Sequence, residues 1–343
     1  MERNHLLKEG KLLNEFGNLK EAGYAFSLVK EYDRGDIKAS ALRIKEWDYY
    51  YFGDDNYGIA LTLDDNGYMG LASCSILDFK NKTYINKANM FWFCLGKVNM
   101  PKTSVDGSIH KIGKNYDLNF INENGKRHLI GNFKNVEGKT LFVDVTLELT
   151  TPHSMVIATP FKKDKHFYYN QKINLLSLKG HFQFGDLTYY FKPNSFGVLD
   201  WGRGVWTYKN TWYWSSVSGK YKDMNIGFNL GYGFGDTSKA SENMLFINDE
   251  AFKLNDCTFN IPLNNKKEED YLKTWTITSN DDSDEINLKF VPILDRHDKT
   301  NALILSQDAH QVFGKFSGYF KVKNQKFEFE DLMGFAEKVS NKW

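Results

Sequence analysis

At residues 197–206 the chain reads Gly-Val-Leu-Asp-Trp-Gly-Arg-Gly-Val-Trp, and at residues 212–214 it reads Trp-Tyr-Trp. Four of the eight tryptophans, one carboxyl group and one guanidinium group therefore fall within eighteen residues. Tryptophan buries a large apolar area around a single N–H, while Asp and Arg are rarely buried except as a pair. This mixture predicts a lined cavity rather than an ordinary surface.

Downstream of this stretch, residues 225–236 read Asn-Ile-Gly-Phe-Asn-Leu-Gly-Tyr-Gly-Phe-Gly-Asp. In a strand, alternate residues point to opposite faces, so one face is bulky and the other carries almost only glycine. The bulky face consists of Ile226, Phe228, Leu230, Tyr232 and Phe234. A bare glycine face indicates that a backbone, an aromatic ring or a ligand approaches closely, and the rings of Trp212 and Trp214 are candidates to cover it.

The rest of the chain has the sequence pattern of an all-β protein. Aromatic residues make up 16% of it, and short alternating runs are separated by turn-forming Asn, Asp and Gly. The clearest expected strands are 48–52, 57–63, 141–149, 182–184 and 286–290, and the clearest turns are 65–67, 124–125, 137–138 and 248–249. Helical periodicity is weak, and the best candidates for short helices are residues 4–15 and 332–339. The spacing predicts antiparallel barrels or sandwiches, and the length suits two in series.

Composition excludes several classes of protein. The 343 residues are 41% apolar, which is enough for a substantial core, and 44 Lys and Arg residues nearly balance 43 Asp and Glu residues. This balance argues against nucleic-acid binding. The N-terminal residues contain no apolar run typical of a signal peptide, and no segment has the length and apolarity of a membrane span, so a cytoplasmic location is expected. Cys74, Cys94 and Cys257 are expected to be buried free thiols.

No cofactor or metal ion is expected from sequence motifs. Gly231-x-Gly233-x-Gly235 lacks the following helix and the surrounding βαβ unit of a dinucleotide site. The eight histidines show neither H-x-H nor H-x-x-x-H spacing, so a metal site would have to be assembled from separate strands.

Several polar residues among the apolar runs are candidates for chemistry, and each also has a structural explanation. Asp200 and Arg203 could form an ion pair that fixes the sheet, or a charged couple at a cavity in which Asp200 acts as an acid or base. Asn229 is either a satisfied buried amide or a group that faces a ligand. The remaining candidates, Glu242, Asn243 and His310, could equally be satisfied core or surface groups.

The chain resembles a microbial family of domain-of-unknown-function proteins, number 2804 in that series. The resemblance rests on residues 197–206, 212–214, 227–236, 242–243, 312–314, 334–337 and Trp343, with Thr207 where proline is common. Such proteins are distantly similar to a calycin-like group with two lipocalin-type domains, which includes carotenoid hydratases and tocopherol cyclases. In that group, an apolar substrate lies in an aromatic pocket between the domains, and a carboxyl group or a neighbouring donor handles the proton.

Together these features predict two lipocalin-like antiparallel β domains, at residues 1–180 and 181–343, with a tryptophan-lined pocket contributed mainly by residues 197–243. The first functional hypothesis is cofactor-independent hydration, isomerisation or cyclisation of an isoprenoid- or lipid-like molecule. Asp200 would donate the proton, Arg203 would set its pKa, and Asn229 or Glu242 would orient substrate or water. The expected substrate-binding residues are Trp201, Trp206, Trp212, Trp214, Asn229, Tyr232, Asn243 and His310.

Two alternatives stay open at this stage. The pocket could belong to a carrier or sensor of an apolar small molecule, which steady turnover would distinguish from an enzyme. Trp212 and Trp214 could instead be stacking platforms for a carbohydrate. Platforms should face solvent, whereas pocket walls should not.

Overall fold

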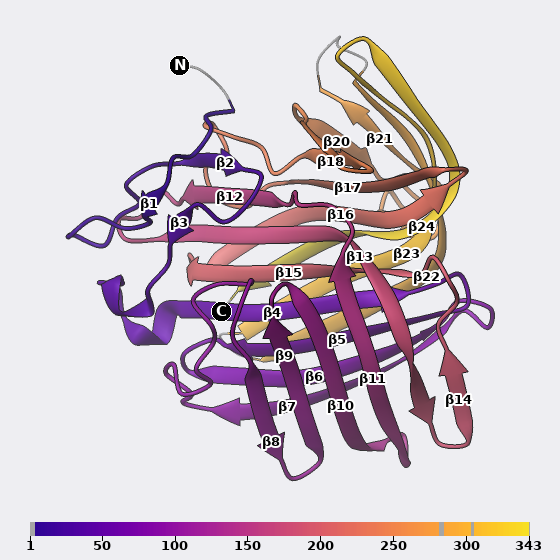
Figure 1. Ribbon diagram of the computed structural model, residues 1–343, viewed down its shortest axis with the longest axis horizontal. Helices are drawn as coiled ribbons and strands as arrows, with labels where there is room; N and C mark the ends of the chain where they lie inside the picture. The colour runs from indigo at the N-terminus through magenta and orange to yellow at the C-terminus, as the bar shows by residue number, and fades with distance from the viewer. Residues whose placement is uncertain (1–3, 281–284, 303–304, 343) are drawn as a thin grey trace.

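A computed structural model describes residues 4–280, 285–302 and 305–342 of the chain (Figure 1). Strands account for 65% of the structure. The only helical segments among the described residues are two short 3-10 helices, η1 (Arg34–Asp36) and η2 (Ala41–Arg43). No helix in those residues is long and apolar enough to cross a membrane. The all-β prediction is therefore confirmed.

The first large sheet has thirteen strands, and its pairs are antiparallel. Its main order is β7-β6-β5-β4-β15-β13-β11-β10-β9-β8, while β12 and β14 pair with β13, and β2 pairs with β12. The strands are β2 (Gly23–Ala25), β4 (Ile44–Gly53), β5 (Tyr57–Asp65), β6 (Met69–Asp78), β7 (Thr83–Trp92), β8 (Ile109–Gly113), β9 (Tyr116–Glu123), β10 (Lys126–Val136), β11 (Lys139–Leu149), β12 (Met155–Pro160), β13 (Phe167–Phe184), β14 (Leu187–Tyr190) and β15 (Phe196–Val205). A small parallel pair, β1 (Gly10–Lys11) with β3 (Lys30–Glu31), lies outside it.

The second large sheet has nine strands, also antiparallel, in the order β19-β18-β17-β16-β24-β23-β22-β21-β20. The strands are β16 (Lys209–Tyr221), β17 (Met224–Tyr232), β18 (Met244–Ile247), β19 (Glu250–Lys253), β20 (Cys257–Asn260), β21 (Trp275–Ser279), β22 (Ile286–Ala302), β23 (Leu305–Val322) and β24 (Gln325–Lys342). The chain passes from the first sheet to the second between β15 and β16. The boundary between two domains after residue 180 remains a prediction. Residues 181–205 contribute strands to the first sheet.

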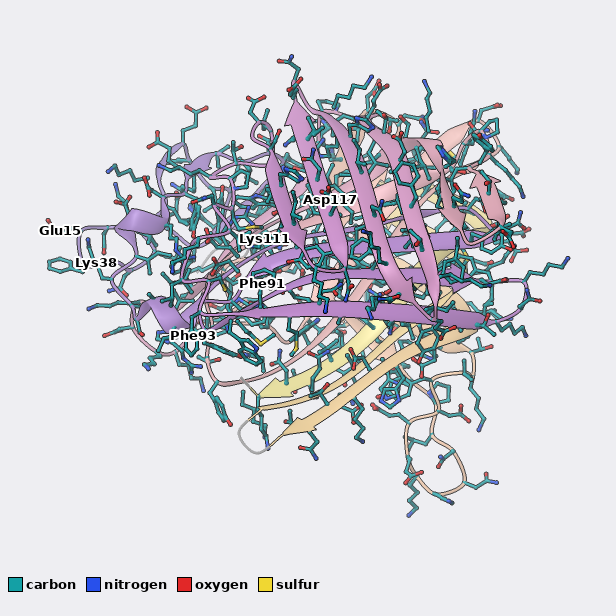
Figure 2. All side chains as sticks on the ribbon, turned by 90° about the horizontal axis from the view of Figure 1, so that it is seen from below. Glu15, Lys38, Phe91, Phe93, Lys111 and Asp117 are labelled. Atoms are coloured by element: carbon teal, nitrogen blue, oxygen red, sulfur yellow. The ribbon has the colours of Figure 1, made fainter. Side chains whose placement is uncertain are left out.

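Each sheet curls around its own apolar core. In the first, β8–β11 cross in front of β4–β7 (Figure 1), and the enclosed core includes Phe52, Leu61 and Trp201. The sheet's two edge strands approach each other where the ammonium of Lys111 on β8 lies 4.8 Å from the ring centre of Phe91 on β7 (Figure 2). The second sheet encloses a separate core. The fold is thus two curled antiparallel sheets of lipocalin-like type in series.

The expected strands and turns are present. Residues 48–52, 57–63, 141–149, 182–184 and 286–290 lie within β4, β5, β11, β13 and β22. The backbone adopts positive φ at Gly67, Asn124, Gly125, Glu137, Gly138 and Asn248, in the turns that join paired strands. Such φ values suit the hairpin turns that Asn and Gly favour. Cys74, Cys94 and Cys257 are buried free thiols, as predicted.

Both expected helices are wrong. Residues 4–15 contain the short strand β1 and irregular backbone, while residues 332–339 lie inside β24. β24 is hydrogen-bonded to β16 on one side and to β23 on the other. Pairing on both sides satisfies the backbone of this segment and overrides its weak helical pattern.

Two apolar clusters and a bulge join the sheets. One cluster combines Tyr51 of the first sheet with Phe313 of the second, and the other combines Tyr168 with Phe246. The bulge interrupts β13 between Ile173 and Leu176. There, the amide of Asn174 donates hydrogen bonds to Ser216 Oγ (2.8 Å) and to the carbonyl oxygen of Phe228 (3.0 Å). Side chains of both sheets therefore pack together in these clusters and at the bulge.

Candidate functional site

A cavity of about 310 Å³ lies between the two sheets. Its wall draws on β4, β5, β6, β7, β13 and β15 of the first sheet and on β16, β22, β23 and β24 of the second. The expectation that residues 197–243 supply most of the wall is wrong, because more of the lining lies outside that range than within it. Residues distant in sequence meet here because each sheet presents one face to the other.

Aromatic rings enclose one part of the cavity. The ring centre of Trp206 lies 4.9 Å from that of Trp47, 4.7 Å from that of Phe234 and 6.0 Å from that of Trp212. These contacts are edge-to-face, the arrangement that aromatic quadrupoles favour. Trp206 and Trp214 are buried and Trp212 is half-buried, so the tryptophans act as cavity walls and do not have the solvent-facing geometry of carbohydrate platforms.

Strand β15 distributes its motif over two faces. All ten of its residues are buried, and Asp200 points into the cavity while Trp201 joins the core of the first sheet. Gly202 is required here, because a Cβ atom at this position would lie 1.9 Å from the indole of Trp47. The glycine thus lets Trp47 lie flat against the strand and form part of the wall.

Asp200 forms its ion pair with Lys172 and not with Arg203. Lys172 stands directly across from Asp200 on β13, and its Nζ lies 2.8 Å from Asp200 Oδ2. Asn170 Nδ2 donates to Asp200 Oδ1 at 2.6 Å. The Lys172 ammonium also lies 3.7 Å from the ring centre of Trp214, a cation–π contact across the two sheets. The expected coupling of Asp200 to Arg203 is wrong because residues 200 and 203 point to opposite faces of the strand.

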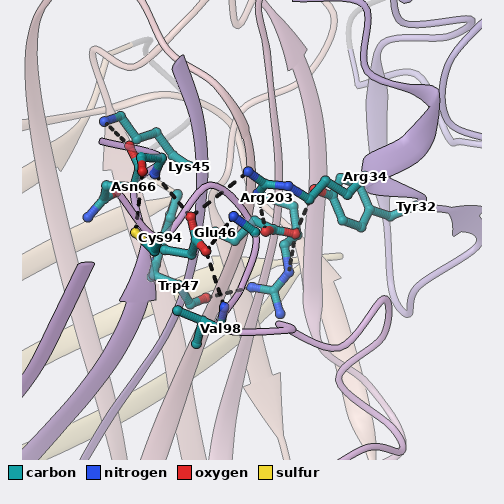
Figure 3. A network of polar contacts seen from close by, with 12 residues as sticks. Tyr32, Arg34, Lys45, Glu46, Trp47, Asn66, Cys94, Val98 and Arg203 are labelled. Carbon is teal, nitrogen blue, oxygen red and sulfur yellow. Dashed lines mark hydrogen bonds and ion pairs between the residues drawn. The ribbon is translucent and has the colours of Figure 1, made fainter. Parts of the chain in front are cut away.

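Arg203 belongs to a polar network inside the first sheet (Figure 3). It is fully buried, and its Nη1 lies 3.0 Å from Asp48 Oδ1 and donates to the carbonyl oxygen of Trp47 at 2.8 Å. Its Nε lies 4.0 Å from Glu46 Oε1, and its guanidinium carbon lies 4.2 Å from the ring centre of Trp201. Arg203 and Trp201 therefore have structural contacts away from the cavity.

Glu337 is a cavity carboxyl group that the sequence reasoning did not select. Both of its oxygens accept hydrogen bonds, Oε1 from Trp212 Nε1 at 2.8 Å and Oε2 from Gln311 Nε2 at 3.0 Å. Tyr49 of the first sheet donates to Gln311 Oε1 at 3.1 Å, so a hydrogen-bonded chain crosses between the sheets. Burial raises the pKa of Glu337 to about 7, although the bond from Trp212 and the charge of Lys172 oppose that rise.

Glu242 is a second buried carboxyl group on the wall. Burial raises its pKa, with the charge of Lys172 acting in the opposite direction. Its carboxylate occupies the space over Gly231, where a Cβ would lie 2.6 Å from Glu242 Oε1. The close approach that the glycine face predicts is therefore present, but at Gly231 the approaching group is a carboxyl group and not a tryptophan ring.

Asn229 lies one layer behind the wall. Its Oδ1 accepts from Trp214 Nε1 at 2.6 Å, and its Nδ2 donates to the carbonyl oxygen of Glu242 at 2.7 Å. Asn243 Oδ1 accepts from the backbone N–H of Gly231 at 2.7 Å. Both amides are buried and hydrogen-bonded, so their position is that of groups that hold the wall in place.

Two further predicted residues lie away from the cavity. Tyr232 stacks on Tyr213 with ring centres 4.6 Å apart, beside the core of the second sheet. His310 lies between Tyr271 and His297, with ring centres 3.7 Å and 3.9 Å away. Phe234, expected to share the face of Tyr232, follows the end of β17 and turns into the cavity instead, because Gly233 has a φ of +94°.

Another part of the cavity lining is polar. Arg296 donates to Ser75 Oγ at 2.8 Å, while exposed Asn86 and Asp298 line the wall nearby. Burial raises the pKa of Asp64, another lining residue, to about 7. The cavity thus combines an aromatic part, buried carboxyl groups and a polar part that reaches solvent.

Comparison with known proteins gives a family and a shared fold. The family described as a domain of unknown function (DUF2804) matches residues 3–343. Kievitone hydratase from Nectria haematococca is a similar structure, with a TM-score of 0.52 and 13% identity over 99% of this chain and 97% of that one. CghA with Sch210972 is similar at a TM-score of 0.44 and 8% identity over 98% of this chain and 97% of that one. No curated protein matches the sequence significantly.

Proposed function

The chain belongs to the DUF2804 family, and on that premise we propose that its cavity carries out cofactor-independent acid–base chemistry on an apolar small molecule. The reaction would be a hydration, an isomerisation or a cyclisation of an isoprenoid- or lipid-like compound. The proposal depends most on one observation, which is the buried carboxyl group of Glu337 on the cavity wall. Its pKa of about 7 is matched to proton transfer near neutral pH.

Glu337 is the proposed proton donor. Trp212 and Gln311 hold its carboxyl group in a fixed orientation, so no reorganisation is needed when a substrate is present. In a hydration, its O–H bond breaks as a C–H bond forms at one carbon of a double bond. Water then adds to the other carbon and returns its surplus proton to the Glu337 carboxylate. Atoms and charge balance without a cofactor.

Asp200 and Glu242 complete the proposed machinery. Asp200 is engaged by Lys172 and Asn170, so we assign the proton to Glu337 and give Asp200 the role of a fixed charge near the reacting atoms. Two carboxyl groups with different surroundings can in this way serve two roles in one site. Glu242, also buried on the wall, is proposed to orient substrate or water. Arg203 has no place in the reaction because it does not line the cavity.

The lining indicates the kind of substrate. A cavity of about 310 Å³ is within the range of small-molecule sites, and its indole and phenyl rings suit a planar or branched apolar body. Arg296, Ser75 and Asn86 at the polar part suit a hydroxyl or carbonyl group at one end of that body. The proposed substrate is therefore apolar along most of its length and polar at one end.

The test begins with solvent extraction and native mass spectrometry of freshly purified protein, which identify any compound that co-purifies. Related compounds are then assayed for turnover with wild-type protein and with Glu337→Gln. We expect Glu337→Gln to bind the compound while turnover falls by roughly two to four orders of magnitude, as for loss of a general acid. The surface change Glu148→Gln is the matched control and should leave turnover unchanged.

A carrier function is the main competing explanation, because aromatic walls alone suffice for binding. Tight binding with no turnover by wild-type protein, for every related compound, would contradict the enzymatic proposal and support the carrier. Equal turnover by Glu337→Gln and wild type would reject Glu337 as the donor.

A further inference from the structure

Two histidines and a carboxylate converge on one face of the hairpin formed by β22 and β23. His297 stands directly opposite His310, and Asp308 lies two residues before His310 on the same strand. One ligand atom from each of the three lies within 4.8 Å of the others. Asp298 and Ala309 line the cavity and alternate with these three residues along the two strands. The two histidines and Asp308 therefore lie on the face of the hairpin opposite to the cavity.

We propose that His297, His310 and Asp308 bind a divalent transition-metal ion of the Zn²⁺ class, with Asp295 supporting His310 from behind. The site is separate from the cavity chemistry and does not depend on it. The sequence gives no metal-binding spacing along the chain because the two histidines come from opposite strands of the hairpin.

The distances are close to those of a metal site. Asp308 Oδ1 lies 2.8 Å from His297 Nε2 and 3.5 Å from His310 Nε2. Ligands bound about 2.0–2.1 Å from a tetrahedral Zn²⁺ are about 3.3 Å from one another. The imidazole planes of His297 and His310 lie within 9° of parallel with their centres 3.9 Å apart, so both rings would have to turn toward a common point for their nitrogens and Asp308 Oδ1 to bind one ion.

The surroundings of His310 leave its Nε2 facing an acceptor. Its Nδ1 lies 2.8 Å from Asp295 Oδ2, which can only accept a hydrogen bond, so Nδ1 donates to Asp295, and its Nε2 lies 3.5 Å from Asp308 Oδ1. A carboxylate behind a histidine is also the usual arrangement behind a metal ligand, where it fixes the ring and its tautomer.

Stacking fixes the orientation of the His310 ring in the absence of an ion. Tyr271 stacks on one face and His297 on the other, at interplanar angles of 7° and 9°. Tyr271 is itself anchored by a 2.7 Å hydrogen bond from its hydroxyl to Glu269. Lys299 Nζ lies 3.0 Å from Asp308 Oδ2, whereas Asp308 Oδ1 faces the histidines.

The donor set selects the class of ion. Two imidazoles and one carboxylate favour Zn²⁺, Co²⁺ or Ni²⁺ over Mg²⁺ and Ca²⁺, which prefer all-oxygen sites. The three protein ligands leave a fourth position for water. Because the other face of the hairpin forms part of the cavity wall, a bound ion would brace that wall.

The experiment uses the full chain without a polyhistidine tag, stripped of metal with a chelator and then titrated with Zn²⁺ by calorimetry and with Co²⁺ by visible absorption. We expect one ion per chain and a tetrahedral Co²⁺ spectrum. His297→Gln and Asp308→Asn should each weaken binding by at least tenfold, and Asp295→Asn by roughly 10–100-fold. Zn²⁺ should raise the Tm of wild-type protein and leave that of His297→Gln unchanged.

His110→Gln is the matched control. His110 Nε2 lies 2.7 Å from Asp117 Oδ1 on the hairpin of β8 and β9, and the residues directly across from these two are not histidines. This variant should bind Zn²⁺ like wild type. Absence of stoichiometric binding by wild-type protein would overturn the proposal. Wild-type affinity in both His297→Gln and Asp308→Asn, with their β structure intact by circular dichroism, would also overturn it.

Discussion

At the scale of single residues, burial decides which carboxyl groups hold a proton near neutral pH. Glu337 and Asp64 both line the cavity, and burial raises the pKa of each to about 7. Asp200 lines the same cavity but is paired with Lys172, which stands directly across from it on β13. Differences in solvation and partners, and not residue type, separate their proposed roles.

The raised pKa of Glu337 gives the protein a characteristic dependence of stability on pH. A carboxyl group with a pKa of 4.5 unfolded and about 7 folded stabilises the fold fully below pH 4.5, and this contribution is lost as the pH rises through about 7. The loss is on the order of 3 kcal/mol. Between about pH 5 and pH 8, the free energy of unfolding of Glu337→Gln should therefore fall less than that of wild type, as urea titrations would measure. Parallel pH profiles for wild type, Glu337→Gln and the control Glu148→Gln would contradict this.

The Asp200–Lys172 pair should behave as a buried ion pair. Both side chains are almost fully buried, so removal of either charge leaves the other without its partner. We expect Asp200→Asn and Lys172→Met each to cost about 3–5 kcal/mol, and the double variant to cost clearly less than their sum. A double-mutant cycle of urea unfolding measures this. Strictly additive losses would show that the two groups do not depend on each other.

Single residues show where sequence reasoning succeeds and where it stops. It selected Asp200, Glu242 and the tryptophans because acids and large rings are conspicuous within apolar strands. It missed Lys172 and Glu337 because the first stands across a strand pair and the second lies at the far end of the chain. Partners across strands depend on register, which the sequence does not specify.

At the scale of elements, β15 and β17 show how glycine creates room for side chains. Gly202 admits the indole of Trp47, and Gly231 admits the carboxyl group of Glu242. The alternation that predicts β17 holds for Ile226, Phe228 and Leu230, which lie in the core of the second sheet. The pattern of a strand was thus readable from the sequence, but the identity of the group over its glycine face was not.

Substitution of Gly231 tests this packing. A Cβ there would lie 2.6 Å from Glu242 Oε1 and 2.9 Å from the carbonyl oxygen of Tyr213, and the second atom belongs to a paired strand that cannot move freely. We expect Gly231→Ala to lower the free energy of unfolding by about 1–3 kcal/mol, and Gly231→Val to lower it more. Gly131→Ala is the control, since its Cβ would meet nothing closer than 3.3 Å. Equal stability of the two alanine variants would refute the close approach at Gly231.

At the scale of the whole molecule, the two curled sheets form the cavity only together. The Tyr49–Gln311–Glu337 chain and the contact of Lys172 with Trp214 both cross from one sheet to the other. Short runs of alternating apolar residues and the turn residues between them made the all-β architecture predictable from the sequence. The cavity's composition was not predictable, because it depends on how one sheet faces the other.

The most direct test of the central claim is the protonation state of Glu337 inside this cavity. Infrared difference spectra between about pH 5 and pH 8 report the carbonyl stretch of protonated carboxyl groups. Wild-type protein should show bands from two buried carboxylic acids that titrate near pH 7. The component that is lost in Glu337→Gln should persist in Asp64→Asn, and the Asp64 component should do the reverse. A wild-type spectrum that is unchanged by Glu337→Gln would contradict the claim that this cavity holds an acid able to protonate a substrate at neutral pH.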